Sequence, residues 1–358
     1  MKNNSPYLRA MYIVLVPIVL LIILLNSGWL QSFIAAAHIN NEKYSVVEYN
    51  FYYFDYLYTF LEKSEEELES LGYDTSKTEA KQQYNDSMTW REYFMHESEK
   101  VMAETAYFYD LAKEAGYEFS EDELSEVEEK IQANNEEMTL YSLSSKNFYL
   151  SYYGSGATEE TYRKELTKKV KAYAYKQHLI DTCVLEDEEI EEYLVENGGG
   201  DYASVNISIL SLEALADRES GEIGESQMDA LGKKYEALLN RIDEGADFDK
   251  LIEKFSTGLL GDANGKMTDA TIEDMTYDGF DFLFEDQENL TEGEIYSNIN
   301  LEGGYVFVLR FDGFGQDGAK RLAEERLAKE HIENEKDEAL GGDYKVMESS
   351  FGMTLVTR

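Results

Sequence analysis

The hydrophobic pattern of the chain begins with one long apolar stretch. Residues 11–25 contain no charged side chain, and together with the residues up to Leu30 they reach the ~20 positions that a bilayer-spanning helix needs. Lys2 and Arg9 precede this stretch, so the positive-inside rule places the N-terminus in the cytoplasm and the bulk of the chain on the extracytoplasmic side. The pattern therefore predicts a single-pass protein of the cell membrane, with a cytoplasmic N-terminus and transmembrane anchor over residues 1–37.

A cleaved signal peptide is the alternative interpretation of the same stretch. The basic start, the apolar run and the small residues Ala35–Ala37 resemble the three regions of such a peptide. These alanines lie well beyond the apolar run, and the polar side chains of Asn26, Ser27 and Gln31 interrupt the gap. The interruption favours an uncleaved anchor. Under either interpretation the chain is exported from the cytoplasm.

Between residues 38 and 199 the apolar positions repeat at helical spacing. In Trp90–Ala115 they recur every three or four residues, as one face of a helix requires, and Gly116 is placed to end that helix. Ser120 is followed three residues later by Glu123, which is the capping-box pattern of a helix start. The pattern predicts an all-α domain over residues 38–199, followed by a glycine linker.

Beyond the linker the apolar residues no longer repeat at helical spacing and instead alternate with a period of two. Ala203–Leu212 and Gly304–Phe311 alternate and are rich in β-branched or aromatic residues, which predicts two strands with helices between them. A charged amphipathic helix is expected at Lys320–Glu338, and an alternating tail strand at Tyr344–Val356. The last helix and the tail need partners outside the small domain that contains the two strands.

The predicted fold class is therefore α+β, with a transmembrane helix, an all-α domain and a small α/β domain. The α/β domain covers residues 200–315. Residues 316–358 form a C-terminal helix and strand that are expected to pack back on the helical domain.

Composition excludes several classes of function. The chain has 358 residues with 73 acidic and 32 basic side chains, a formal charge of −41, so it lacks the basic surface on which nucleic-acid binding depends. The one cysteine, Cys183, excludes a disulfide framework. The four histidines are far apart and match no zinc-binding spacing. We expect neither a metal site nor a cofactor.

Three segments of the helical region resemble the PrsA/SurA type of extracytoplasmic foldase. Ala37–Ser45 is similar to the opening of that family, where a short strand and turn lead into a helix. Leu111–Leu124 is similar to its junction between a helix, a glycine and the next helix, and Leu185–Tyr193 to the segment before its isomerase domain. The resemblance implies a SurA/PrsA-like chaperone domain at residues 38–199.

The α/β region resembles a parvulin, the small prolyl-isomerase domain of the same family. Gly245–Leu251, followed by Ser256, looks like its G-x-D-F-x-x-L helix. Leu290–Ser297 is similar to its L-x-x-G-E turn, and Gly304 with Tyr305 opens its last strand. The resemblance implies a parvulin-like domain at residues 200–315.

The departures from the parvulin pattern fall where its chemistry would be. The two family histidines align with Ser208 and Val306. Valine neither donates nor accepts a hydrogen bond, and serine lacks the shape and reach of imidazole. These departures therefore predict a degenerate site with weak or absent isomerase activity, and we assign no catalytic residue.

Apolar and aromatic side chains are the candidates for substrate binding. The apolar side of the isomerase cup is assigned to Met275, Phe280, Met267 and Phe284, and ordinary core packing is the alternative for all four. Aromatic side chains are also dense in residues 49–60 and 148–153, where tyrosine rings offer flat apolar faces with polar rims. Tyr152 and Tyr153 are the candidates in the second run, with helix packing again as the alternative.

The resemblance implies a membrane-anchored, extracytoplasmic folding factor that binds unfolded or newly exported polypeptides. An active prolyl isomerase with an atypical site is one alternative, and a non-catalytic adaptor or structural protein of the cell envelope is another. The sequence leaves the clients and the oligomeric state open, a homodimer included.

Overall fold

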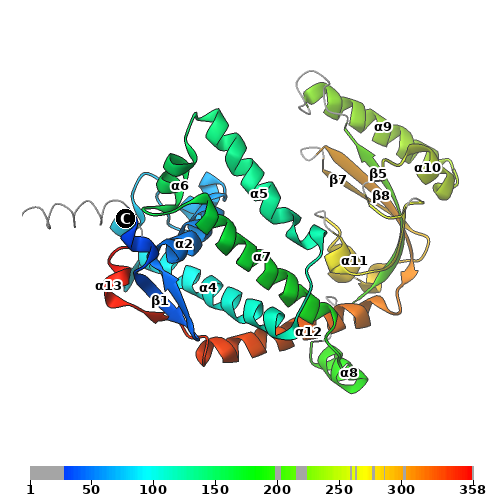
Figure 1. Cartoon of the computed structure of the whole chain (residues 1–358). Helices are drawn as coiled ribbons and strands as arrows, with labels where there is room; N and C mark the ends of the chain where they lie inside the picture. Colours follow the sequence, from blue (N-terminus) through cyan, green and yellow to red (C-terminus); the bar gives the residue numbers. More distant parts are fainter. Residues whose placement is uncertain are drawn as a thin grey trace, which may run out of the picture. The chain divides into compact units, whose positions relative to one another are not determined.

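The computed structural model describes most of the chain in two compact units (Figure 1). The described residues are 28–197, 203–214, 224–258, 260–262, 264–275, 279–285, 287–300 and 304–356. Unit 1 comprises Met1–Thr182 and His331–Arg358, and unit 2 comprises Cys183–Glu330. The sequence predicts domain boundaries at residues 199 and 315, whereas the units divide at 182 and 330.

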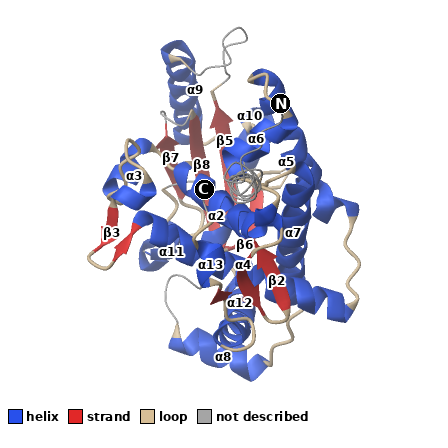
Figure 2. Cartoon of the chain, turned by 60° about the vertical axis from the view of Figure 1, so that its left-hand side comes forward, coloured by secondary structure: helices blue, strands red, loops and turns tan. Residues whose placement is uncertain are grey.

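Unit 1 is mainly helical. In chain order its described elements are η1 (Leu30–Ser32), β1 (Ala35–Ile39), β2 (Glu42–Ser45), α2 (Val46–Leu61), α3 (Glu65–Ser70), η2 (Glu79–Lys81), β3 (Gln83–Asn85), β4 (Met88–Thr89), α4 (Trp90–Ala115), α5 (Glu121–Leu140), α6 (Ser145–Tyr153), α7 (Glu159–Asp181), the second part of α12 (Gly318–Gly341), β9 (Met347–Glu348) and α13 (Ser350–Met353). Strands β3 and β4 form a separate hairpin (Figure 2).

Local sequence signals explain where the long helices begin and end. Ser45, Thr89 and Ser120 each form a capping box with the glutamate three residues later, which satisfies backbone N–H groups at the starts of α2, α4 and α5. Gly116 ends α4 with φ 64°, a left-handed conformation that glycine adopts without strain. The stop predicted from the sequence at Gly116 is therefore present.

The core of unit 1 is built on aromatic side chains of α2. Helix α2 contacts α4, α6 and α7, and its rings pack among theirs. Phe51, Tyr52 and Tyr53 are almost fully buried, as are Trp90 and Phe94 of α4. Edge-on contacts dominate, such as that between Phe51 and Tyr52 with ring centroids 5.1 Å apart.

The C-terminal residues complete the sheet of unit 1. Strand β1 lies between β2 and β9 and pairs antiparallel with both. The amide of Ser349 donates to the carbonyl of Ala36 at 2.7 Å, and Arg91 of α4 donates to the carbonyl of Val356 at 3.1 Å. Strand β1 and the C-terminal segment are thus held together by hydrogen bonds to main-chain carbonyls.

The prediction of a tail strand at Tyr344–Val356 is mostly wrong. Only Met347–Glu348 is a strand, and Ser350–Met353 forms the short helix α13. Ser349 starts this helix because its side chain accepts a hydrogen bond from the amide of Gly352. The alternating pattern concealed this capping signal.

Unit 2 contains a four-stranded antiparallel sheet. Its described elements are α8 (Asp187–Glu196), β5 (Val205–Glu213), α9 (Glu225–Asp243), α10 (Phe248–Phe255), β6 (Lys266–Ala270), η4 (Ile272–Asp274), α11 (Phe282–Glu285), η5 (Gln287–Asn289), β7 (Ile295–Asn300), β8 (Tyr305–Phe314) and the first part of α12. The strand order is β6-β5-β8-β7, with β5 and β8 in the middle (Figure 2).

The two faces of this sheet carry separate hydrophobic clusters. On one face, Ile207, Ile209 and Phe307 pack with residues around α11. On the other face, Leu210, Leu212 and Val306 pack with α9 and α10. Successive residues of a strand point to opposite faces, so this division follows directly from the alternation in β5 and β8.

A third small cluster explains why unit 2 extends beyond the predicted α/β domain. Ile190 of α8 packs against Leu322 and Leu327 of α12. Both segments therefore belong to unit 2, although they lie outside residues 200–315.

The described residues do not contain the transmembrane helix of the predicted fold class. No helix in the described part of the chain is long and apolar enough to cross a bilayer. Residues 11–27 of the predicted span lie outside the described residues, and after them come the 3-10 turn η1 and strand β1, which includes Ala35–Ala37. Over the described residues the fold class is corrected to α+β without that helix, a finding that contradicts the prediction of a single-pass membrane protein.

Substitution of Gly352 should loosen the tail of the chain. A Cβ atom at this position would lie 1.8 Å from the carbonyl oxygen of Ala35, so Gly352→Ala must push α13 away from β1. We expect a loss of about 2 kcal/mol in the free energy of unfolding, measured by urea denaturation. Gly341→Ala is the matched control, since nothing lies within 4 Å of its Cβ, and it should leave stability unchanged or raise it. Equal effects of the two substitutions would contradict the close packing.

Glu99 of α4 should make the stability of unit 1 depend on pH. Burial raises its pKa from 4.5 to about 7; the Glu348 carboxylate adds to this rise, and the hydroxyl of Tyr49, which donates to Glu99 at 2.6 Å, opposes it. The folded state therefore binds this proton more tightly than the unfolded state, and its contribution to stability is lost as pH rises from about 4.5 through 7.

Glu99→Gln keeps an acceptor for Tyr49 and removes the charge. The substitution should stabilise the protein by about 1 kcal/mol at pH 8 and by little at pH 4.5. The value at pH 8 is reduced because solvent screens the charge of a partly exposed side chain. Thermal unfolding at the two pH values measures the difference. An equal effect at both would show that Glu99 does not titrate in this range.

Candidate functional site

Ser208, at the first family histidine position, lies in a closed polar network. Its side chain is fully buried on the α10 face of the sheet. Its hydroxyl donates to the carboxylate of Asp312 and accepts from Nη2 of Arg310 at 3.0 Å. Arg310 also pairs with Asp249 of α10 at 3.2 Å, and the carboxylate of Asp312 is the main cause that raises the pKa of Arg310. The hydroxyl is therefore already committed to protein partners.

Val306, at the second family histidine position, is a core residue. It is fully buried and lies opposite Leu212 in the register of β5 and β8. Both side chains belong to the cluster that α9 and α10 cover. This position presents neither a polar group nor an exposed surface.

The four candidates for the apolar cup lie on the other face of the sheet. Phe280 and Phe284 are 2% and 1% exposed, and the ring of Phe280 packs 5.4 Å from that of Phe307. Met267 and Met275 are half-buried against the same cluster. The structure brings these four side chains together, but it separates them from Ser208 and Val306 by the thickness of the sheet.

The candidate site of unit 2 does not bring its polar and apolar groups together. Lowering the amide barrier of ~18–20 kcal/mol needs positioned hydrogen-bond groups beside an apolar cup. Here the hydroxyl of Ser208 and the apolar candidates do not face a common space, and two of the apolar rings are sealed in the core.

The two aromatic candidates of unit 1 differ in exposure. Tyr153 is 9% exposed and packs in the core, 4.9 Å from the ring of Tyr162. Tyr152 is half-buried, and its hydroxyl donates to Glu137, which raises its pKa to about 12. Its ring stands edge-on to Tyr58 at 5.9 Å. Only Tyr152 presents part of its ring to solvent.

The first aromatic run is mostly core. Tyr49 and Tyr52 are 1% exposed, and burial raises the pKa of both hydroxyls. Tyr52 donates to the buried carboxylate of Glu165 at 3.2 Å. The alternative of helix packing describes this run better than a client-binding surface does.

A cavity that the sequence did not indicate lies between η1, α6 and the start of α7. It has a volume of about 590 Å³. Its lining residues are Gly28, Trp29, Ser32, Ser145, Lys146, Leu150, Ser155, Gly156, Ala157, Thr158 and Glu159. Trp29 is 57% exposed and Leu150 is 45% exposed, so the apolar part of the cavity is open to solvent. Sequence reasoning missed Trp29 because it follows the apolar run and was assigned to the membrane.

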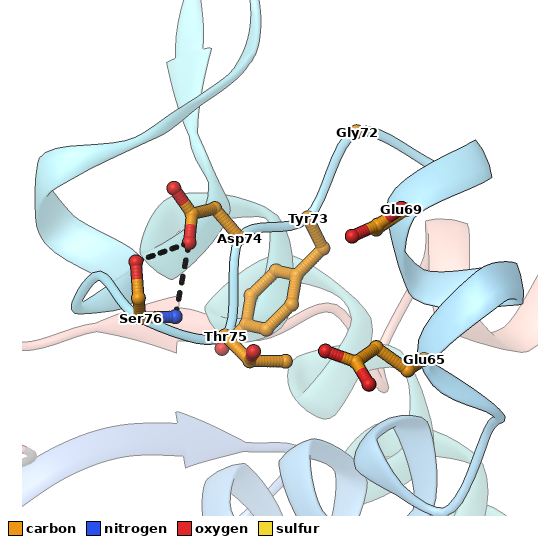
Figure 3. Close-up of a pocket in the computed structure, with 7 residues that line it drawn as sticks. All are labelled: Glu65, Glu69, Gly72, Tyr73, Asp74, Thr75 and Ser76. Atoms are coloured by element: carbon orange, nitrogen blue, oxygen red, sulfur yellow. Dashed lines mark hydrogen bonds between the residues drawn. The ribbon is translucent and has the colours of Figure 1, made fainter.

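A second cavity in unit 1, of about 430 Å³, is acidic (Figure 3). Glu65 and Glu69 of α3 line it together with residues 72–76. Asp74 accepts hydrogen bonds from Ser76 and pairs with Lys77, and these contacts lower its pKa to about 2. Its charge is thus compensated within the loop, and no cluster of metal-ligating side chains is present in the described part of the chain.

Comparison with known proteins finds chaperones. No protein-family model matches the chain. The chain is 29% identical over 148 residues to the chaperone SurA of Cupriavidus pinatubonensis. This match covers 41% of the chain and 28% of that protein. The chain is 28% identical over 157 residues to the chaperone SurA of Cupriavidus metallidurans, covering 44% and 31%. The chain thus matches less than a third of the length of these curated relatives.

Solved structures give weaker likenesses. PrsA from Bacillus subtilis is 17% identical with a TM-score of 0.31, covering 73% of this chain and 90% of that structure. The foldase protein PrsA from Streptococcus pneumoniae is 14% identical with a TM-score of 0.35, covering 76% and 97%. A SurA-like chaperone from Campylobacter jejuni is 10% identical with a TM-score of 0.27, covering 88% and 99%. The resemblance of this chain to the PrsA/SurA-type foldases is confirmed by the sequence matches to two SurA chaperones.

Proposed function

We propose that the protein is a folding factor that binds unfolded polypeptides. The proposal is supported by the sequence matches to two proteins named as SurA chaperones. The observation that carries it is the open cavity of unit 1, where half-exposed apolar side chains of Trp29 and Leu150 lie among polar ones. A homodimer and a membrane segment are not part of the proposal.

The chemistry of this cavity suits a segment without fixed structure. Exposed apolar side chains in a concave surface gain free energy when a partner covers them. The hydroxyl groups of Ser145 and Ser155 on its wall are able to bond main-chain groups of an extended client, whatever its sequence. The combination favours contact with many clients over selection of one.

The isomerase activity of the parvulin-like region is proposed to be weak or absent. This part rests on the position of Ser208 and Val306 behind the sheet relative to Met275 and Phe280. Desolvation of a prolyl bond would require the buried rings of Phe280 and Phe284 to open first.

Binding of a client should protect Trp29 from solvent. The other tryptophan, Trp90, is 1% exposed, so a neutral quencher such as acrylamide reports mainly on Trp29 in the unmodified chain. We expect reduced carboxymethylated ribonuclease A, a permanently unfolded protein without tryptophan, to decrease the quenching, whereas native ribonuclease A should not. Leu150→Ser should weaken this binding about ten-fold, because one half-buried apolar contact is lost.

The matched control for Leu150 is Leu71, which is 50% exposed in unit 1 and does not line the cavity. Leu71→Ser should leave the affinity unchanged. Equal losses in the two variants would contradict a role for the cavity. High affinity for one folded partner with none for unfolded chains would instead indicate an adaptor.

The full-length protein should not accelerate prolyl isomerisation. Cis-to-trans conversion of a panel of X-Pro tetrapeptides should proceed at the uncatalysed rate, tens to hundreds of seconds at 25 °C, with and without the protein. Acceleration that is abolished in the Met275→Ala, Phe280→Ala double variant would show that the apolar face of the sheet is a working site.

A further inference from the structure

Unit 2 has a pocket on the face of the sheet opposite to Met275 and Phe280. It lies between the end of β5, helix α9 and helix α10, and has a volume of about 290 Å³. Its lining residues are Leu212, Glu213, Lys234, Ala237, Leu238, Arg241, Lys254, Phe255 and Thr257. The volume suits one or two apolar side chains of a ligand.

The floor of the pocket is apolar. Leu212 and Leu238 are 5% and 3% exposed and belong to the cluster beneath α9 and α10. Phe255, at the end of α10, is half-buried and presents its ring beside them. An apolar side chain entering here would lose water on several sides.

The rim of the pocket is cationic, in contrast with the acidic chain. Lys234, Arg241 and Lys254 are exposed around the floor, and Glu213 is the one acidic side chain of the lining. Arg241 and Lys254 lie over the Phe255 ring, with 4.9 and 5.3 Å to its centroid. Within the described residues none of these three cations forms an ion pair.

Several cations elsewhere in the described part of the chain are compensated by ion pairs. Arg310 and Arg321 each pair with aspartates of unit 2, and Lys176 pairs with two glutamates of unit 1. In a chain of charge −41, three neighbouring cations without such partners leave a local positive potential. Such a potential attracts anionic groups to the rim of an apolar pocket.

The spacing of two of these cations defines the ligand further. Lys234 and Arg241 are seven residues apart on α9, hence on the same side of the helix and about 10.5 Å apart along its axis. An unfolded segment in the polyproline II conformation repeats every three residues at about 3.1 Å per residue. Two carboxylates at positions i and i+3 of such a segment therefore lie on one side, about 9.3 Å apart.

We propose that this pocket binds an acidic segment of an unfolded polypeptide, in which apolar side chains lie between two carboxylates three residues apart. The carboxylates pair with Lys234 and Arg241, and one intervening side chain enters the pocket beside Phe255. Lys254 adds positive charge from the α10 side. The inference rests on the proposed function, because the ligand is a segment of a client. The pocket lies in unit 2, however, whereas Trp29 lies in unit 1.

Three peptides with blocked ends test the proposal on the full-length protein. They contain Asp-Leu-Phe-Asp, Asn-Leu-Phe-Asn or Lys-Leu-Phe-Lys between glycines and carry the same zwitterionic rhodamine label. We expect anisotropy to show binding of the aspartate peptide, about ten-fold weaker binding of the asparagine peptide, and the weakest binding of the lysine peptide. Binding of the aspartate peptide should weaken with added salt.

The double variant Lys234→Gln, Arg241→Gln should lose about ten-fold in affinity for the aspartate peptide and little for the asparagine peptide. Lys233→Gln is the matched control, since this exposed lysine lies on the same helix outside the pocket. Equal affinities for the three peptides, or equal losses in the double variant and the control, would overturn the proposal.

The same variants separate this inference from the proposed function. Protection of Trp29 by carboxymethylated ribonuclease A should persist in the double variant. If that protection is present while the peptides do not discriminate by charge, the pocket proposal fails and the folding function stands. If the protein binds the aspartate peptide but no unfolded protein, the folding function fails and a peptide-binding pocket remains.

Discussion

The packing of α2 against its neighbouring helices is the interaction on which unit 1 depends. Its tyrosines bring rings into the core together with hydroxyl groups, and each buried hydroxyl needs a partner. Tyr49 therefore requires Glu99, and Tyr52 requires Glu165, a carboxylate that is itself buried. Lys168 reaches the hydroxyl of Tyr44 at 2.6 Å and adds a cation to the same interior. The aromatic core thus fixes the positions of charged groups on α4 and α7, and the requirement for partners explains why an acidic chain places carboxylates inside.

In unit 2 the corresponding constraint is the period of a strand. Residues 207 and 208 of β5 cannot face the same side of the sheet. The polar side chain of Ser208 and the apolar side chain of Ile207 therefore point to opposite faces. Ser208 became part of a network with Arg310 and Asp312, which stabilises the α10 face. The rings of Phe280 and Phe284 fill the other face. The polar and apolar candidates of β5 and its neighbours therefore lie on opposite faces of the sheet.

The sequence predicts those features that depend on neighbours along the chain. Ser120 and Gly116 mark helix ends because capping and left-handed backbone need only local residues. The pairing of Met347 with His38 joins residues from opposite ends of the chain, and no local pattern indicates it. The position of Trp29 is not predicted for a related reason. Its apolar neighbours in the sequence indicate a bilayer span, whereas the structure places Trp29 directly before the 3-10 turn η1. Exposure of single side chains, and with it the candidate cavity, required the structure.

Net charge is likewise a poor guide to a particular surface of this molecule. A total of −41 argues against binding of anions when the chain is considered as one sphere. Screening limits that average field to about 10 Å in ordinary buffers, so a ligand at a pocket responds mainly to the side chains within that distance. Around Phe255 those side chains include three cations and one carboxylate of the lining, whereas around Asp74 they include two glutamates of α3. The lining side chains of the two cavities therefore differ in the sign of their charge, although both belong to the same acidic chain.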